Sequence, residues 1–189
     1  LPDNPWIGPG FPLGVTPGID PTTATVNAKT QSFANETYRE KISRVMLYAN
    51  NMLTYTPPGS PGGLDHSEDV LLRGGGHCEG LTMAIAALMR NVGIPARMIR
   101  GQSAIWSASG EMQQHTVIQY WLPNAGWVDW DHMMDRWELR SDFIRLGSYE
   151  GAPVPQQEPL NFWHHREFIP GGGGNLNGPY HYQLIGQSF

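Results

Sequence analysis

The sequence has little charge of either sign. Lys, Arg, Asp and Glu make up 15% of the 189 residues, against roughly 25% in typical globular domains. The 12 basic residues form no stripe and the formal net charge is −5, whereas a broad nucleic-acid footprint needs clustered Lys and Arg. The composition therefore argues against a nucleic-acid partner, and we expect none.

Long apolar runs are lacking as well. The longest, residues 81–89 (LTMAIAALM), is followed by Arg90, and it has about half of the ~18 residues that suggest a membrane span. We therefore expect no membrane span. Yet 40% of the residues are hydrophobic and seven are tryptophan, which is too many for a disordered chain. The sequence predicts a folded domain.

The chain has a single cysteine, Cys78, which excludes an internal disulfide and the usual cysteine-rich zinc sites. The seven histidines form no H-E-x-x-H motif, and the acidic cluster at 129–135 lacks the twelve-residue loop pattern of calcium sites. The glycine runs lack the Gly-Lys-Ser/Thr of a phosphate-binding loop. We expect neither a metal nor an organic cofactor.

Glycine (23 residues) and proline (16 residues) are abundant instead, and they predict a chain rich in loops. Because both recur throughout residues 1–31, we interpret that segment as an extended arm. Residues 132–179 are poorly periodic, and we interpret them as a loop-rich insertion. The length suits one domain, so residues 1–189 are treated as a single unit.

In the remaining segments, the spacing of apolar residues indicates either helices or strands. Apolar residues recur at helical spacing over about residues 36–54, where Thr37 and Glu40 are placed for a capping box, and again over 78–92. The second helix is rich in alanine, and we expect it to be central and buried. Strands are predicted at 97–105, 115–122, 127–131 and 180–185, with a hairpin turn at 123–126. Helices followed by antiparallel strands predict an α+β fold.

Cys78 has the surroundings of a reactive thiol. Three glycines and His77 precede it, and it opens the predicted central helix. Unpaired backbone N–H groups and the positive end of the helix dipole would then favour the thiolate. The alternative is a buried cysteine that only fills space, because free cysteine is among the most buried residue types.

A thiolate nucleophile needs a base and a group that orients the base. His115 at the start of one predicted strand and Asp131 at the end of the next are candidates for these roles. We expect strand alternation to place only one of Asp129 and Asp131 against His115, and we favour Asp131. Taken separately, His115 could be a strand-edge histidine and Asp131 a turn carboxylate.

A family resemblance connects the three residues. The run GGGHCEGLTMAIAALMRNVGIPARMIRGQ, followed by His115 and by YWLPNAGWVDWD, resembles the core of the transglutaminase-like superfamily, a group of papain-like Cys-His-Asp enzymes that includes bacterial-type cysteine proteases. The match covers about residues 36–131. It implies a papain-like core in which the cysteine helix packs on an antiparallel sheet, with Cys78 as nucleophile, His115 as base and Asp131 as orienting acid.

The sequence departs from the family pattern at two places. Val117 stands where the family often has tryptophan, and no tryptophan lies between Trp6 and Cys78 to act as an upstream oxyanion-hole residue. The backbone N–H of Cys78 is one candidate donor to the oxyanion, and Gln113 or Gln114 is a candidate for the second.

Two further residues are candidates for substrate binding. His77 is expected to face solvent or the substrate cleft, since neighbouring side chains at a helix start diverge. Trp130 belongs to a group of tryptophans around the proposed site that could grip a substrate, with core packing as the alternative.

These residues predict cysteine-dependent acyl transfer on the amide bond of a peptide or protein, through a thioester. Water is the expected acceptor, which makes the protein a peptidase or amidase. Two alternatives stay open: transamidation with an amine acceptor, and a binding domain with a vestigial triad.

Overall fold

The computed structural model describes residues 12–33, 35–56, 66–103, 113–123, 125–135 and 143–149. Four α-helices, one 3₁₀ helix and six strands lie within these ranges. The helices are α1 (Ala24–Thr30), η1 (Gln31–Phe33), α2 (Tyr38–Met52), α3 (Ser67–Arg73) and α4 (Cys78–Asn91). The strands are β1 (Thr54–Tyr55), β2 (Gly75–Gly76), β3 (Ala96–Ser103), β4 (Gln113–Leu122), β5 (Gly126–Trp130) and β6 (Phe143–Tyr149).

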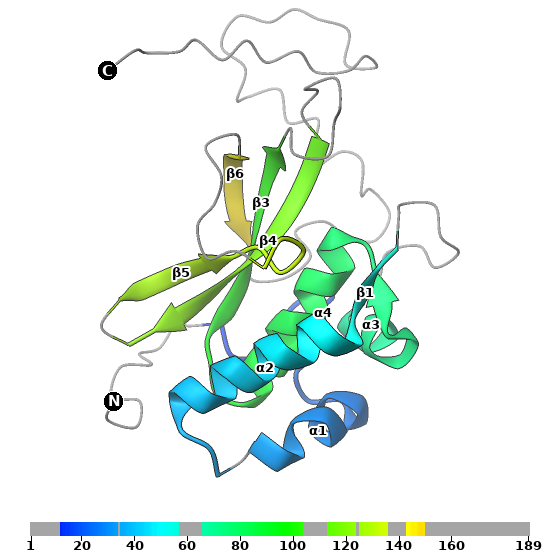
Figure 1. Cartoon of the computed structure of the whole chain (residues 1–189), viewed down its shortest axis with the longest axis vertical. Helices are drawn as coiled ribbons and strands as arrows, with labels where there is room; N and C mark the ends of the chain where they lie inside the picture. The colour runs from blue at the N-terminus through cyan, green and yellow to red at the C-terminus, as the bar shows by residue number, and fades with distance from the viewer. Residues whose placement is uncertain are drawn as a thin grey trace, which may run out of the picture.

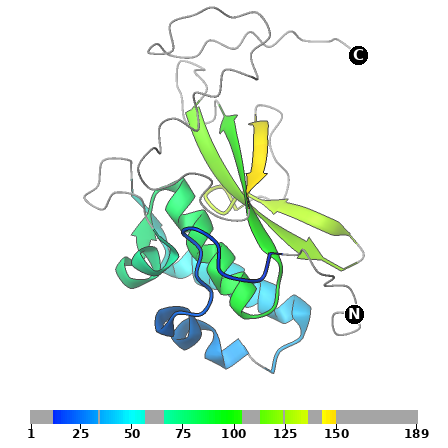
Figure 2. The ribbon, with the colours of Figure 1, turned by 180° about the vertical axis from the view of Figure 1, so that it is seen from behind.

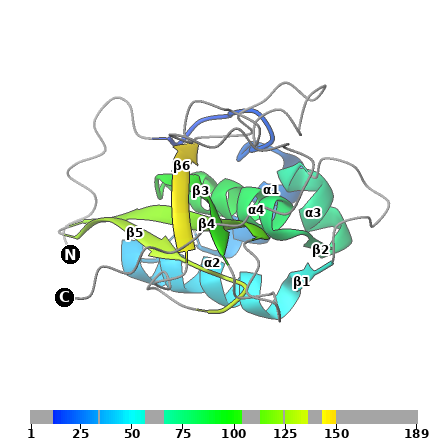
Figure 3. The same cartoon turned by 90° about the horizontal axis from the view of Figure 1, so that it is seen from above.

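Helix α4 is the centre of the molecule. It contacts α1, α2 and α3 on one side and strands β3 and β4 on the other (Figures 1 and 3). Its side chains are buried from Leu81 through Arg90, so the prediction of a central, buried helix is confirmed. The helix ends where Gly93 adopts a φ of 85°, and the amide of Ile94 then donates to the carbonyl of Met89 at 2.8 Å.

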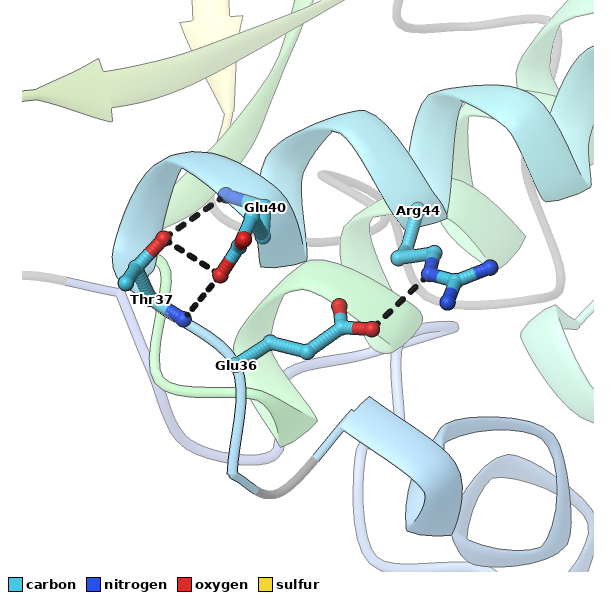
Figure 4. Close-up of polar contacts among 4 residues, drawn as sticks. All are labelled: Glu36, Thr37, Glu40 and Arg44. Atoms are coloured by element: carbon cyan, nitrogen blue, oxygen red, sulfur yellow. Dashed lines mark hydrogen bonds and ion pairs between the residues drawn. The ribbon is translucent and has the colours of Figure 1, made fainter.

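Helix α2 begins as its sequence predicts. The Thr37 side chain accepts from the Glu40 amide, and the Glu40 carboxylate accepts from the Thr37 amide at 2.8 Å, which forms the expected capping box (Figure 4). Arg44 donates to Glu36 at 2.8 Å on the same surface. The buried side chains of α2 form one stripe toward the core, namely Tyr38, Ile42, Val45, Met46 and Ala49.

The main sheet has the order β5-β4-β3-β6, and every neighbouring pair is antiparallel (Figures 1 and 2). The hairpin predicted at residues 123–126 connects β4 and β5. Strands β3 and β4 pair along their length, and this register sets Gly101 opposite His115. The helices on one side of an antiparallel sheet confirm the α+β fold class.

Two elements depart from the sequence-based expectations. Part of the proposed arm forms helix α1, capped by the Thr23 side chain, with Val26 fully buried. The last proline of that region is Pro21, so nothing prevents a helix after it. Strand β6 lies in the proposed loop-rich insertion and pairs with β3 across a register shift at Arg100/Gly101. The strand predicted at 180–185 lies outside the described residues.

A second, two-stranded sheet lies just before Cys78. Helix α3 ends at Gly74, whose φ is 74°, and the chain continues into β2, which pairs in parallel with β1. Thr54 donates to the carbonyl of Gly74 and Thr56 to that of Gly76, both at 2.9 Å. Strand β1 is thus fixed against the segment that leads to Cys78.

None of the helices within the described residues has the length and apolar character needed to cross a membrane.

Candidate active site

Cys78 is the first residue of α4, and the residue is half-buried. The preceding residue, His77, is the N-cap, and its carbonyl accepts from the Leu81 amide at 2.9 Å. Thr82 donates its hydroxyl to the Cys78 carbonyl at 2.7 Å. The first turn of the helix is therefore ordered by its own contacts, and the first backbone N–H groups of a helix have no partner within it.

His115 and Asp131 reach the site from the main sheet. His115 lies near the start of β4 and Asp131 follows the last residue of β5. His115 Nε2 lies 2.8 Å from Asp131 Oδ2, and only 2% of His115 and 8% of Asp131 is exposed. The second carboxylate oxygen, Oδ1, accepts from the Met133 amide at 3.2 Å. The imidazole also packs edge-on against the Phe143 ring, with centroids 6.2 Å apart, so its orientation is held from two directions.

Hydrogen bonding extends from this pair to the thiol. Burial alone would raise the pKa of the Cys78 thiol, but its hydrogen bonds with His115 and His77, and their charges, lower the pKa to about 6. Burial would likewise lower the pKa of His115, but its hydrogen bonds with Asp131 and Cys78 raise that pKa to about 9. Between about pH 6 and pH 9, the Cys78 thiolate therefore faces the His115 imidazolium. Because Nε2 is engaged by Asp131, Nδ1 is the ring nitrogen left for the thiol.

Asp129 makes a different contact. Its Oδ1 accepts from Gln119 Nε2 at 2.6 Å, and Gln119 is its partner in the β4–β5 ladder. We expected strand alternation to separate Asp129 from Asp131, but that argument is wrong, because residues two positions apart share a face. Their positions along the strand separate them, since Asp131 lies beyond the last β4–β5 pair, Ile118 with Trp130.

An ion pair connects the start of α4 with β3. Glu79, which follows Cys78, accepts a hydrogen bond from Arg100 Nη2. The Arg100 side chain is almost fully buried, and its neighbour Gly101 pairs with His115 in the sheet. This contact therefore joins the element that carries the thiol to the strand beside the imidazole.

The sequence model of the transglutaminase-like superfamily matches residues 24–132. The chain belongs to the transglutaminase-like superfamily. The match spans more than half of the chain and contains Cys78, His115 and Asp131, so the resemblance found in the sequence is confirmed. No curated protein matches the sequence.

Solved structures of other proteins share the fold. A candidate cysteine protease from Cytophaga hutchinsonii superposes with a TM-score of 0.61 and 17% identity, over 75% of this chain and 46% of that protein. Legionella pneumophila LapG superposes with a TM-score of 0.53 and 17% identity, over 66% of this chain and 71% of LapG. The calcium-bound form of LapG superposes with a TM-score of 0.52 and 18% identity, over 66% of this chain and 71% of LapG. The chain thus spans less than half the length of the Cytophaga protein, and these likenesses concern the fold.

The residues that the sequence suggested for substrate binding in this superfamily member differ in their contacts and exposure. His77 hydrogen-bonds the Cys78 thiol. Gln113 and Gln114 are the first residues of β4, and both are exposed. Trp130 is fully buried in the core, where its indole Nε1 donates to Asp135 Oδ1 at 3.3 Å. A side chain without exposed surface cannot line a substrate site in this conformation, so we assign Trp130 a packing role.

Two residues near the site were not predicted from the sequence. Tyr55 on β1 interacts electrostatically with Cys78, although a two-residue strand has no recognisable sequence pattern. His132 follows Asp131, and both of its ring nitrogens are buried without a hydrogen-bond partner among the described residues. Its position next to the proposed acid could have drawn attention to it, but a single histidine in a turn forms no motif that predicts a role.

Within the described ranges, no three His, Cys, Asp or Glu side chains are grouped so that they could hold a metal ion. The site itself brings together a thiolate, an imidazolium and, behind the imidazolium, a carboxylate.

Proposed function

We propose that this protein is a cysteine-dependent hydrolase that acts on amide bonds of peptides or proteins through a thioester. The observation that supports the proposal best is the continuous hydrogen bonding from Cys78 through His115 to Asp131, with its 2.8 Å His–Asp contact. Nucleophile, base and orienting acid are the three parts that such catalysis needs. Membership in a family of cysteine-dependent enzymes agrees with it.

The first half of the proposed reaction forms the thioester. The Cys78 thiolate attacks the amide carbonyl, a C–S bond forms, and the carbonyl oxygen takes up the electron pair as an oxyanion. When the intermediate collapses, the C–N bond breaks and the leaving nitrogen takes a proton from the His115 imidazolium. Asp131 holds the ring in position and stabilises its charged form.

The second half releases the acid. His115, now neutral, takes a proton from water as the water oxygen attacks the thioester carbonyl. The C–S bond then breaks, the carboxylic acid leaves, and Cys78 returns to the thiolate beside a protonated His115. An amine in place of water would give a transamidated product instead. We favour water because a fold neighbour is described as a candidate cysteine protease.

The state of the thiol is the first test. Iodoacetamide should alkylate Cys78 at a rate that rises with a midpoint near pH 6, the pKa given by its hydrogen bonds to His115 and His77, instead of near the ~8.5 of an ordinary thiol. The rate is measured by intact mass against pH, with Cys78→Ala as the unreactive control. A midpoint near ~8.5, or labelling only after unfolding, would contradict catalysis and favour the binding-domain alternative.

The acceptor is the second test. The protein is incubated with casein and dansylcadaverine, and the products are identified by mass, in the presence of EDTA and again with added calcium. We expect Cys78-dependent hydrolysis products that form equally well with EDTA, because we propose that no metal or organic cofactor is required. Strict calcium dependence, with amine incorporation that exceeds hydrolysis at millimolar amine, would indicate a transamidase.

A further inference from the structure

The strand that carries Tyr55 is built into the approach to Cys78. Tyr55 is opposite Gly76 in the parallel β1–β2 pair, and Cys78 follows Gly76 by two residues. A Cβ on Gly75 would lie 2.7 Å from the carbonyl oxygen of Thr54, so the glycine allows a separation between the strands that no other residue would permit. The position of Tyr55 relative to the thiol is thus set by backbone contacts.

The Tyr55 side chain is open to solvent on this side of the molecule. About 42% of the residue is exposed, and the charge of Cys78 acts on its phenol. Partial burial and the negative charge of Cys78 raise the pKa of Tyr55 above its ordinary value. At neutral pH the phenol therefore keeps its proton, and it has an O–H group to donate.

Attack by Cys78 requires donors for the oxyanion. The backbone N–H of Cys78 at the start of α4 is one candidate, and a second donor is the usual complement. Gln113 and Gln114 were the candidates in the sequence, but neither exposed side chain hydrogen-bonds another described residue or is among the groups that influence the Cys78 thiol. Tyr55 combines a donor group, access from solvent and a position on the strand paired with the segment that leads to Cys78.

We propose that Tyr55 is a catalytic residue whose hydroxyl donates a hydrogen bond to the oxyanion formed when Cys78 attacks the substrate carbonyl. This inference rests on the proposed function. No proton is transferred in the step: the carbonyl electron pair moves to oxygen as the C–S bond forms, the Tyr55 O–H stabilises the charge, and the contact weakens when the carbonyl is restored. Tyr55 therefore contributes to thioester formation and to thioester hydrolysis.

The test compares two reactions of the same thiol. p-Nitrophenyl acetate acylates a reactive cysteine through an oxyanion and releases p-nitrophenolate, whereas iodoacetamide alkylates the sulfur by displacement and forms no oxyanion. Tyr55→Phe removes only the hydroxyl. We expect it to slow acylation by about 10²-fold, which is the usual effect of losing one oxyanion donor, and to leave the rate of alkylation and its pH midpoint unchanged.

Tyr48→Phe is the matched control, because the Tyr48 ring faces Lys29 on α1, with the ammonium 5.8 Å from its centroid. It should acylate at the unaltered rate. Acylation by Tyr55→Phe at the unaltered rate would overturn the inference, as would an equal loss of alkylation and acylation, which would indicate an effect on the thiol itself. If the unaltered protein releases no more p-nitrophenolate than Cys78→Ala, the proposed function fails, and the role of Tyr55 fails with it.

Discussion

At the scale of residues, the site depends on two opposing pKa shifts. The thiol pKa falls to about 6 and the imidazole pKa rises to about 9, although burial acts in the other direction on both groups. Hydrogen bonds and opposite charges together outweigh desolvation, since hydrogen bonds to charged partners are roughly twice as strong as neutral ones. The activity should therefore rise with a midpoint near pH 6 as the thiolate forms and fall with a midpoint near pH 9 as His115 loses its proton.

Asp131 is the residue whose charge maintains this state, and its replacement gives a specific prediction. Asp131→Asn keeps the shape but removes the charge that raises the pKa of His115. We expect amide or ester turnover to fall by roughly 10²- to 10⁴-fold. The midpoint of Cys78 alkylation should also move to higher pH, because an imidazole with a lower pKa provides less positive charge to the thiolate.

Asp129→Asn is the matched control for this prediction. Asp129 contacts Gln119 and not the imidazole, so turnover and the alkylation midpoint should stay near those of the unaltered protein. Equal losses in the two variants would contradict the assignment of Asp131. Kinetics with p-nitrophenyl acetate and pH-dependent alkylation together provide the measurement.

At the scale of elements, the thiol lies where three short pieces of structure meet. Helix α3 ends at Gly74, β2 runs beside β1, and α4 begins at Cys78. Glycines make these changes of direction possible. Gly74 adopts a φ of 74°, and the backbone of Thr54 approaches Gly75 too closely for a side chain there. The glycines before the cysteine thus serve strand packing as well as access to the thiol.

This close packing predicts a cost for the smallest possible change. Gly75→Ala would place a Cβ 2.7 Å from the Thr54 carbonyl oxygen, and backbone atoms must move to relieve the clash. We expect a loss of about 1–3 kcal/mol in the free energy of unfolding, the usual cost of overpacking. Acylation should also slow, because β1 carries Tyr55. Urea unfolding and ester kinetics measure the two effects.

Gly14→Ala is the control, since no atom lies within 4 Å of a Cβ added there. Its free energy of unfolding should change by no more than about 0.5 kcal/mol. Unaltered stability and activity in Gly75→Ala would show that β1 can move without consequence, and would remove the argument that it positions Tyr55.

At the scale of the whole molecule, long periodic segments were the predictable part. Helices α2 and α4 and strands β3, β4 and β5 all follow from apolar periodicity and their bounding glycines and prolines. Helix α1 and strand β6 were overlooked because they lie in segments whose glycine and proline content suggested loops. The β1–β2 pair has two residues per strand, and pairing of this length depends on tertiary contacts that leave no local pattern.

The candidate site divides in the same way. Cys78, His115 and Asp131 have local signals: a glycine turn at a helix start, and polar residues at the ends of strands in a hairpin. Tyr55 has none, because it approaches Cys78 through a parallel pair that joins distant segments. Trp130 belonged to an aromatic cluster, but its burial could be known only once β5 was packed on the core. Local chemistry was predictable, whereas proximity across the fold was not.

His132 links the site to the stability of the whole molecule. Its ring nitrogens are buried without a hydrogen-bond partner among the described residues. Burial, chiefly, lowers the pKa of His132 to about 4, with Asp131 acting against the shift and His115 adding to it. The folded protein therefore keeps this imidazole neutral at pH values where the unfolded chain takes up a proton. A neutral ring beside Asp131 adds no positive charge that would compete with His115.

The protonation of His132 predicts how stability depends on pH. Below the unfolded value of 6.5 the unfolded state binds more protons than the folded state, so the free energy of unfolding declines as the pH falls, until the folded pKa of about 4 is reached. The loss attributable to this residue should be about 2 kcal/mol between pH 7 and pH 5.

His132→Phe keeps a flat ring against Trp130, whose centroid lies 6.1 Å away, but cannot take up a proton. Urea unfolding of both proteins at the two pH values isolates the contribution, since the carboxylates are common to both. If the two proteins lose the same free energy between pH 7 and pH 5, His132 is not the buried neutral group that its surroundings indicate.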